Sequence, residues 1–245
     1  PITRSMTLTL GLFSVVLSPA LLAENDPDQE SQAPAKALEL GSTSITAEGL
    51  GANTEHTGAY TTGSMGTATR LNLSIKETPQ SVSVITRQQM DDFNLNTLTE
   101  VMRQTTGVVV QHLDSDRVGY SSRGYGITNF QIDGMLNTFG RMKSDADTII
   151  YDRVEVVRGA TGLTTGAGDP SATVNMVRKR PTAQWQAKTG VSGGSHDNYY
   201  SYLDVGGPLA FDGRLRGRTV LAYRDSQSYR DNYALQREVG YGILE

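Results

Sequence analysis

The stretch from Tyr151 to Pro181 constrains the fold most, because a glycine-rich reversal separates two runs with a strand-like pattern. The runs read DRVEVVRG and SATVNMVRKRP, and the glycines between them lie at positions 159, 162, 166 and 168. Glycine allows positive φ and close backbone approach, so this loop can reverse the chain tightly. Arg153, Glu155 and Arg158 lie in the first run. Buried strands rarely carry such charges unpaired, so the pattern favours a domain lodged inside a polar cavity.

The same glycine loop does not fit a nucleotide site. A phosphate-binding loop needs Gly-x4-Gly-Lys-Ser/Thr, and no lysine follows these glycines at the required place. A dinucleotide fingerprint needs a third glycine and a helix, whereas Asp169 and Pro170 follow Gly168 and a β-branched run comes next. The glycines therefore serve the backbone turn itself.

Composition excludes several classes of function. The chain has 245 residues, a net charge of -4 and no cysteine, which excludes disulfides, thiolate nucleophiles and cysteine-ligated zinc. The acidic balance argues against nucleic-acid binding. His56, His112 and His196 are scattered through polar sequence and read as surface residues. We therefore predict no enzyme, no catalytic residues, no metal ligand set and no cofactor.

The N-terminal residues 1–23 have the pattern of a secretory signal peptide. Arg4 precedes an apolar run from Met6 to Ala23 that ends in small residues, and the acidic segment ENDPDQESQ follows at once. A transmembrane anchor is the alternative, but the run is short and is interrupted by Ser14, Ser18 and Pro19. We expect export and cleavage of this segment.

Residues 24–70 have few large apolar side chains and are predicted to be a flexible linker. Within it the short run GSTSIT, Gly41–Thr46, is β-prone, and on composition alone it can be plain linker or a docking strand. We expect ordered structure to begin near Leu71.

Residues 71–182 read as a mixed α/β unit. A strand is predicted at Ser81–Thr86, followed by helical segments RQQMDDF and TLTEVMRQT, the second capped by Asn96 or Thr97. Further strands are expected around GVVVQHL and NFQID, with a tight turn at Asp133-Gly134. This alternation of element types predicts a sheet packed with short helices.

Residues 183–245 change to long alternating strands without helices. In RLRGRTVLAYRDS, Leu215, Leu221 and Tyr223 point one way, while Arg218 and Arg224 point the other. Such alternation suits a membrane barrel with a wet lumen, and a soluble antiparallel sheet would look the same. The tyrosines of this region resemble an interfacial aromatic girdle: Tyr199, Tyr200, Tyr202 and Tyr223.

Four motifs in order, ETPQSVSVITRQQMDD, SSRGYGITNFQIDG, the stretch Tyr151–Pro181 and the later hairpins, resemble TonB-dependent outer-membrane receptors for ferric siderophores, with the ferripyoverdine type as the nearest match. The resemblance spans about residues 41–245. It implies an α+β plug domain at residues 71–182, with a mixed four-stranded sheet and short helices. Residues 183–245 would be the first antiparallel strands of a 22-stranded transmembrane β-barrel, truncated here.

The resemblance also implies a mechanism and partners. A ferric siderophore would bind on the outer face, and a strand formed by the TonB box, within residues 41–47, would pair with TonB. The box residues are Ser42, Thr43, Ser44, Ile45 and Thr46. The protein would lie in the outer membrane of a Gram-negative bacterium, in contact with lipid and with no nucleic acid. The short spacing before Gly41 predicts uptake without a signalling domain. The alternative is a secreted or surface β-rich adhesin or structural protein.

Site residues follow from the same resemblance. Arg123 matches a plug-apex arginine that faces the siderophore, and Tyr120 and Tyr125 flank it. Stacking on an aromatic chromophore and ordinary loop packing are both open for the tyrosines. Arg153, Arg158 and the neighbouring Glu155 would take part in plug–barrel pairing. Iron would be held by the siderophore, so no protein metal ligand and no cofactor are implied.

Overall fold

The computed structural model describes residues 51–114, 117–137, 145–160, 165–166, 169–228 and 233–245. All of them lie in one structural unit, Thr46–Glu245. The predicted signal peptide and the predicted TonB box, Ser42–Thr46, are outside the described residues. Most of the glycine loop after Gly159 is outside them as well.

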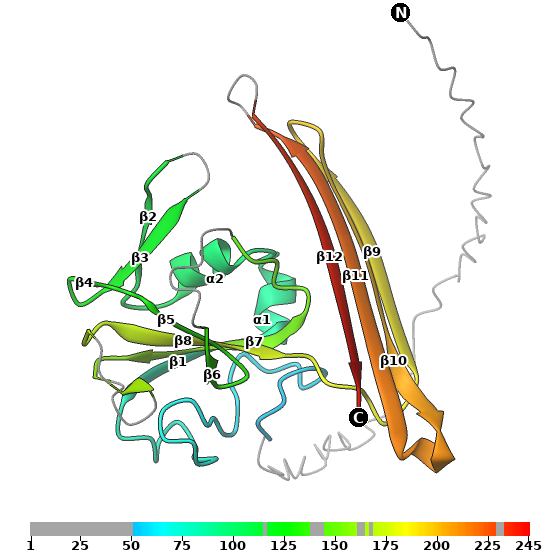
Figure 1. Ribbon diagram of the computed structural model, residues 1–245, viewed down its shortest axis with the longest axis horizontal. Helices are drawn as coiled ribbons and strands as arrows, with labels where there is room; N and C mark the ends of the chain where they lie inside the picture. Colours follow the sequence, from blue (N-terminus) through cyan, green and yellow to red (C-terminus); the bar gives the residue numbers. More distant parts are fainter. Residues whose placement is uncertain (1–50, 115–116, 138–144, 161–164, 167–168, 229–232) are drawn as a thin grey trace, which may run out of the picture. The chain divides into compact units, whose positions relative to one another are not determined.

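A five-stranded mixed sheet forms the centre of residues 51–182, here called the N-terminal domain (Figure 1). Its strand order is β1-β7-β8-β5-β6; β5 and β8 are parallel and the other neighbours antiparallel. The strands are β1 (Ser81–Thr86), β5 (Asn129–Ile132), β6 (Met135–Leu136), β7 (Tyr151–Arg158) and β8 (Ala172–Arg178). The prediction of four strands was wrong by one. The extra strand is two residues long and arises because Asp133 and Gly134, at φ 51° and 77°, turn the chain back on β5.

Two short helices cover one face of this sheet: α1 (Arg87–Asp92) and α2 (Leu98–Gln104). Thr86 caps α1 by accepting a hydrogen bond from the N–H of Gln89. Thr97, rather than Asn96, caps α2, in a capping box with Glu100. Neither helix has the length and apolar character needed to cross a membrane.

The two faces of the sheet differ in chemistry. Val154, Val156 and Met176 point toward the helices and are fully buried in the main core. The alternate residues Arg153 and Glu155 point the other way and are buried too. What covers that second face is the strap, defined here as residues 51–73, whose side chains pack against it and which runs on the side opposite the helices in Figure 1.

The strap corrects the expectation of a flexible linker up to residue 70. Met65 and Ala68 are buried against Val157 on the second face, and Met65 pairs with Leu73 in an isolated antiparallel bridge. Thr67 donates a hydrogen bond to Glu155. Composition did not reveal this order, because the strap is held mainly by polar contacts to residues far away in sequence.

A small second sheet carries the loop that contains Arg123. It has the order β2-β3-β4, with β2 (Val109–His112), β3 (Val118–Ser122) and β4 (Tyr125–Gly126). The hydroxyl of Ser122 connects this sheet to the rest of the domain by donating a hydrogen bond to the carbonyl of Gly107. Gly107 follows α2 and has a φ of 76°. The tight β3–β4 turn is formed by Arg123 and Gly124, both at positive φ.

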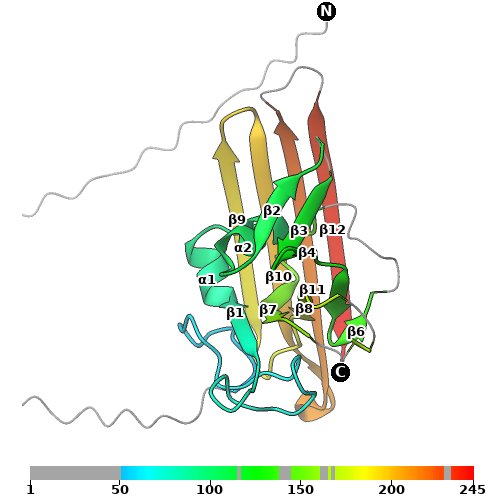
Figure 2. The same cartoon turned by 90° about the vertical axis from the view of Figure 1, so that its left-hand side faces the viewer.

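The C-terminal residues form a four-stranded antiparallel sheet, order β12-β11-β10-β9, whose strands run side by side in Figure 2. The strands are β9 (Gln186–Gly194), β10 (Asn198–Ala210), β11 (Leu215–Gln227) and β12 (Ala234–Leu244). A 3-10 turn, η1 (Phe211–Gly213), joins β10 to β11. The expected 22-stranded barrel stays a prediction.

Alternation along β11 has the predicted sense. Val220 and Ala222 are buried against Ile149 of the N-terminal domain, while Leu221 is half exposed on the outer face. The aromatic girdle needs correction: Tyr200 is 7% exposed and packs in the same inner cluster, with Tyr202 against it. Strand parity is the reason, since Tyr199 and Tyr200 must face opposite ways.

Candidate functional site

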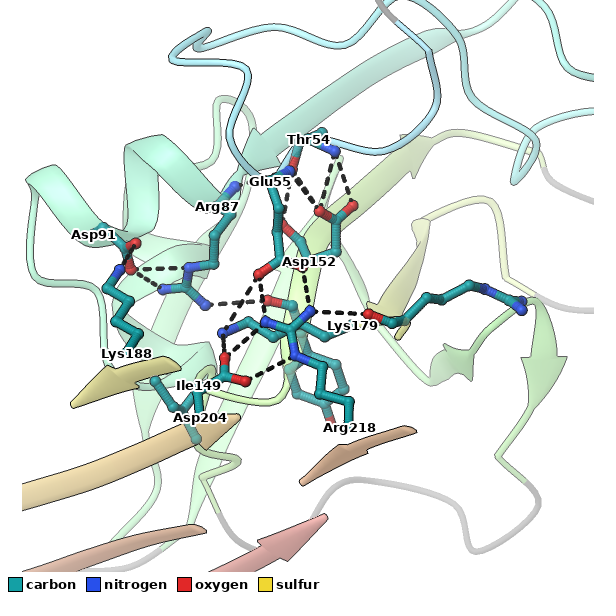
Figure 3. A network of polar contacts seen from close by, with 12 residues as sticks. Thr54, Glu55, Arg87, Asp91, Ile149, Asp152, Lys179, Lys188, Asp204 and Arg218 are labelled. Carbon is teal, nitrogen blue, oxygen red and sulfur yellow. Dashed lines mark hydrogen bonds and ion pairs between the residues drawn. The ribbon is translucent and has the colours of Figure 1, made fainter. Parts of the chain in front are cut away.

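A buried charge network joins the strap and the N-terminal domain to strands β10 and β11 (Figure 3). Arg218 of β11 donates to both oxygens of Glu55, at 2.6 and 2.8 Å, and to both oxygens of Asp204 on β10, at 2.7 Å each. Lys179, just after β8, lies 2.9 Å from Asp204 and 3.7 Å from Glu55. Two cations and two anions from four separate segments therefore neutralise one another.

These four side chains are between 2% and 6% exposed. Burial lowers the pKa of the Lys179 ammonium, and the nearby charge of Arg87 lowers it further, against the opposing effect of Asp204 and Glu55. Buried charges of this kind are costly unless each is paired and hydrogen bonded. The arrangement therefore holds its parts in one register, and removing any one member leaves another charge uncompensated.

The network continues into the strap at Thr54. The carboxylate of Asp152 accepts hydrogen bonds from the N–H groups of Thr54, at 3.0 Å, and Glu55, at 2.8 Å. The N–H of Arg87 donates to the hydroxyl of Thr54, and the Arg87 guanidinium donates to the carbonyls of Thr148 and Tyr151. The start of the strap is thus fixed at once to the sheet, to α1 and, through Glu55, to β11.

The residues predicted for plug–barrel pairing lie on both faces of β7, Arg153 and Glu155 on one and Arg158 on the other, and all three bond within the N-terminal domain. Arg153 donates to Asp152 at 2.8 Å and to Glu155 at 2.6 Å. Arg158 donates to the hydroxyls of Ser81 and Ser83 and to a carbonyl after α2. Burial, and then the nearby Arg123, lower the pKa of Arg158. Pairing of these residues with further barrel strands stays a prediction.

The pairing that the structure does contain was missed at the sequence level. Arg218 was placed on the inner side of β11, which is correct, but no partner was assigned to it. Glu55 lies 163 residues away from it. A carboxylate on the inner side of the preceding strand, Asp204, was the available signal, because it opposes Val220, two residues from Arg218, in the β10–β11 register.

Arg123 and Tyr125, two of the three predicted ligand residues, lie exposed on the β3–β4 turn, where the Tyr125 ring is 51% exposed. The Arg123 guanidinium lies against Gly159, where a Cβ would approach its Nη1 to 2.9 Å. Gly159 also has φ 106°, and this backbone conformation favours glycine. The first residue of the glycine loop thus supports the predicted ligand arginine.

Tyr120 is buried, so of the two alternatives left open for its ring, stacking on a ligand and ordinary packing, the structure favours packing and removes Tyr120 from the predicted ligand residues. Its side chain is 8% exposed and lies edge-on to Phe130, with ring centroids 5.8 Å apart. Its hydroxyl shares a 2.9 Å hydrogen bond with Thr99 of α2. Tyr120 therefore positions the β3 strand on the core rather than contacting a ligand. Within the part of the chain that the structure describes, no group of three or more histidine and carboxylate side chains gathers into a metal site.

Comparison with known proteins identifies relatives. Residues 74–173 match the family described as TonB-dependent Receptor Plug Domain. The chain is 49% identical over 220 residues to the ferripyoverdine receptor of Pseudomonas aeruginosa. The aligned region covers 88% of this chain and 27% of the relative. The chain thus spans about a quarter of the length of the curated relatives that it matches.

Solved structures agree. The outer-membrane ferripyoverdine receptor of Pseudomonas aeruginosa bound to ferripyoverdine has a TM-score of 0.76 at 49% identity, covering 79% of this chain and 26% of that one. The alcaligin outer membrane receptor from Bordetella pertussis has a TM-score of 0.73 at 44% identity, covering 80% of this chain and 34% of that one. The similarity includes segments beyond residue 173, and so extends past the plug match.

Proposed function

Since residues 74–173 of this chain belong to the TonB-dependent receptor plug domain family, we propose that the protein is an outer-membrane receptor and energy-coupled transporter for a ferric siderophore of the pyoverdine class. The observation that carries the proposal is the 49% identity to a ferripyoverdine receptor across both the plug and the first strands. The protein is a receptor and not an enzyme, and iron enters as part of its cargo.

The finer parts of the proposal rest on named segments. Strands β9–β12 are the beginning of a 22-stranded barrel in the outer membrane of a Gram-negative bacterium, with Leu203 and Leu221 on the lipid side. TonB engages Ser42–Thr46 by strand addition from the periplasm. The short spacing between Ala23 and Gly41 supports uptake without a signalling domain. The plug assignment accounts for the charged strand β7, which the alternative of an adhesin leaves unexplained.

The ligand surface proposed here consists of Arg123 and Tyr125. A guanidinium offers several donors to anionic or carbonyl-rich chelates, and an exposed phenol ring offers a face for an aromatic chromophore. Arg153, Glu155 and Arg158 complete the plug side of the plug–barrel contact in the proposal. Arg153 and Glu155 lie on the strap side of β7, where Thr67 donates to Glu155, whereas Arg158 lies on the other side of the sheet, near Arg123.

The test uses the protein expressed from its complete gene in a strain that lacks it. Growth and radioactive iron uptake are measured in iron-poor medium on a panel of ferric chelates that includes ferripyoverdines of different peptide chains. We expect uptake from at least one ferripyoverdine. Uptake restored by no chelate in the panel would refute the function.

A binding measurement tests the ligand surface. Arg123→Ala should weaken binding of the transported chelate by about 10- to 100-fold. This is the change in affinity that corresponds to the free energy of one charge-assisted hydrogen bond. Arg214→Ala, an exposed arginine next to the β10–β11 turn, is the matched control and should bind normally. If the Arg123 and Arg214 variants bound the chelate with equal affinity, Arg123 would have a structural role and would not contact the ligand.

A further inference from the structure

A row of polar side chains crosses the second face of the central sheet, and the strap satisfies only part of it. Gln131 of β5 lies opposite Asn175 of β8, which in turn lies opposite Glu155 of β7. Thr67 of the strap donates a hydrogen bond to Glu155 and accepts one from Asn175. Gln131 is only 2% exposed, yet among the residues that the structure describes its side-chain amide has no hydrogen-bond partner. Because an unpaired buried amide is costly, Gln131 has hydrogen-bonding capacity to offer to a ligand.

This amide borders a polar pocket of about 420 Å³ between the strap and the sheet. The strap contributes Gly66 and Thr67 to the walls of the pocket, and the β5–β6 turn contributes Gly134 and Met135. Its volume lies within the range of small-molecule pockets, about 300–1,000 Å³. The unpaired amide of Gln131 therefore lies beside a space that a small molecule can fill.

The charges around the pocket favour an anion. Three guanidinium groups line it against two carboxylates, which leaves one net positive charge: Arg70, Arg153 and Arg180 against Asp133 and Glu155. Arg153 is buried and donates through its Nε to Glu155 and through its Nη1 to Asp152. Its Nη2 makes no hydrogen bond within the described part of the chain. Arg153 therefore has donors left for an anionic group, and charge-assisted hydrogen bonds of this kind are the strong ones.

We propose that this pocket, here called the strap pocket, binds a small carboxylate that carries a hydroxyl group next to its charged group. Arg153 and the amide nitrogen of Gln131 donate to the carboxylate, and the amide oxygen of Gln131 accepts from the hydroxyl. Since the strap forms one wall, the ligand binds only while the strap is in place and holds it there. The inference goes beyond the proposed transport function and does not depend on it.

The test uses the protein expressed from its complete gene and purified in detergent, with malate as the probe. Titration calorimetry should show malate binding. Succinate has the same carbon chain and both carboxylates but no hydroxyl, so it leaves the amide oxygen unpaired and should bind about fivefold more weakly or worse. Malate at about ten times its Kd should slow proteolytic cleavage within the strap about tenfold, because it binds only the closed form.

Two variants, each with a matched control, locate the site. Gln131→Leu keeps most of the side-chain volume but removes the amide, and it should weaken malate binding about tenfold or more; Gln111→Leu, an exposed glutamine of β2, should bind as the wild type does. Gly66→Leu fills the pocket from the strap, where a Cβ would meet only Asn72 Oδ1, at 3.8 Å, and it should abolish malate binding. Gly51→Leu, a strap position with nothing within 4 Å of a Cβ, should not.

The Gly66 variant keeps Gln131 in place, so the test does not depend on the folding of the Gln131 variant. Absence of malate binding to the unmodified protein would overturn the proposal, as would wild-type affinity in the Gly66→Leu variant. Equal affinities for malate and succinate would overturn the proposed ligand class. None of these measurements involves iron or a siderophore, so each of these failures would leave the proposed transport function standing.

Discussion

Replacing Arg218 with methionine should destabilise the plug more than any exposed substitution near it. Methionine keeps most of the side-chain volume but removes all five contacts of the guanidinium, four to carboxylate oxygens and one to the carbonyl of Arg180. Glu55 and Asp204 then share Lys179 as their nearest cation. The buried network changes from neutral to one net negative charge.

The magnitude follows from that imbalance. Removing one partner of a buried ion pair costs about 3–5 kcal/mol, because the remaining charge is desolvated and unpaired. A second change, Glu55→Gln, restores neutrality, since Asp204 and Lys179 then balance. The double variant should therefore be more stable than the sum of the two single effects predicts, by a coupling free energy of about 1–3 kcal/mol.

Plug stability can be measured by pulse proteolysis in increasing urea on the purified protein in detergent, with cleavage followed in the strap. Arg216→Met is the matched control, because Arg216 lies on the same strand two residues away and is exposed; its urea midpoint should stay close to that of the wild type. Strictly additive effects of Arg218→Met and Glu55→Gln would refute the reasoning, because they would mean that the two side chains do not compensate each other in the protein.

Two further predictions concern the proposed TonB segment and pH. Ile45→Pro removes a backbone donor needed for strand addition, so iron uptake should stop while ferripyoverdine binding persists; uptake at the wild-type rate would contradict the TonB-box assignment. Burial raises the pKa of the Asp147 carboxyl, so the folded state disfavours its charge. This cost is absent below the usual aspartate pKa, grows as pH rises above that value, and is constant above the raised pKa. Asp147→Asn should therefore gain urea stability relative to wild type as pH rises above about 4, and a difference independent of pH would show that Asp147 does not titrate in this way.

Local patterns in the sequence predicted much of the fold. The period-2 alternation of β1, β7 and β8, the helix cap at Thr97 and the turn at Asp133-Gly134 are set by neighbouring residues, and each has the expected structure. Arg218 on the inner side of β11 follows from parity alone. Tyr120 and Tyr125 were not distinguished, although β3 reads VGYSS and Val118 shares a strand face with Tyr120; this short alternation was the available signal that Tyr120 faces the core.

The strap's part of the charge network could not be predicted, because Thr54 and Glu55 are far from their partners along the chain. Thr54 and Glu55 meet Asp152, Lys179 and Arg218 across separations of about a hundred residues or more. A composition argument treats the strap as unable to offset its ordering entropy. That argument counts apolar burial only and omits polar contacts. In the folded protein, the N-terminal domain and strand β11 supply fixed partners for the polar groups of the strap, whose burial would otherwise be costly.

The strap also explains why strand β7 carries charges at all. A sheet with one apolar face needs cover on that face only, and its second face would normally meet solvent or a second apolar layer. Here the second face is polar in part: Glu155 and Asn175 both bond to Thr67 of the strap, while the neighbouring Val157 packs against Met65 and Ala68. A wholly apolar second face would bind the strap through buried apolar area, and it would expose an aggregation-prone surface whenever the strap left. A polar face holds it by a few directional bonds and remains compatible with water afterwards. This behaviour suits a cover that leaves and returns during the transport proposed above.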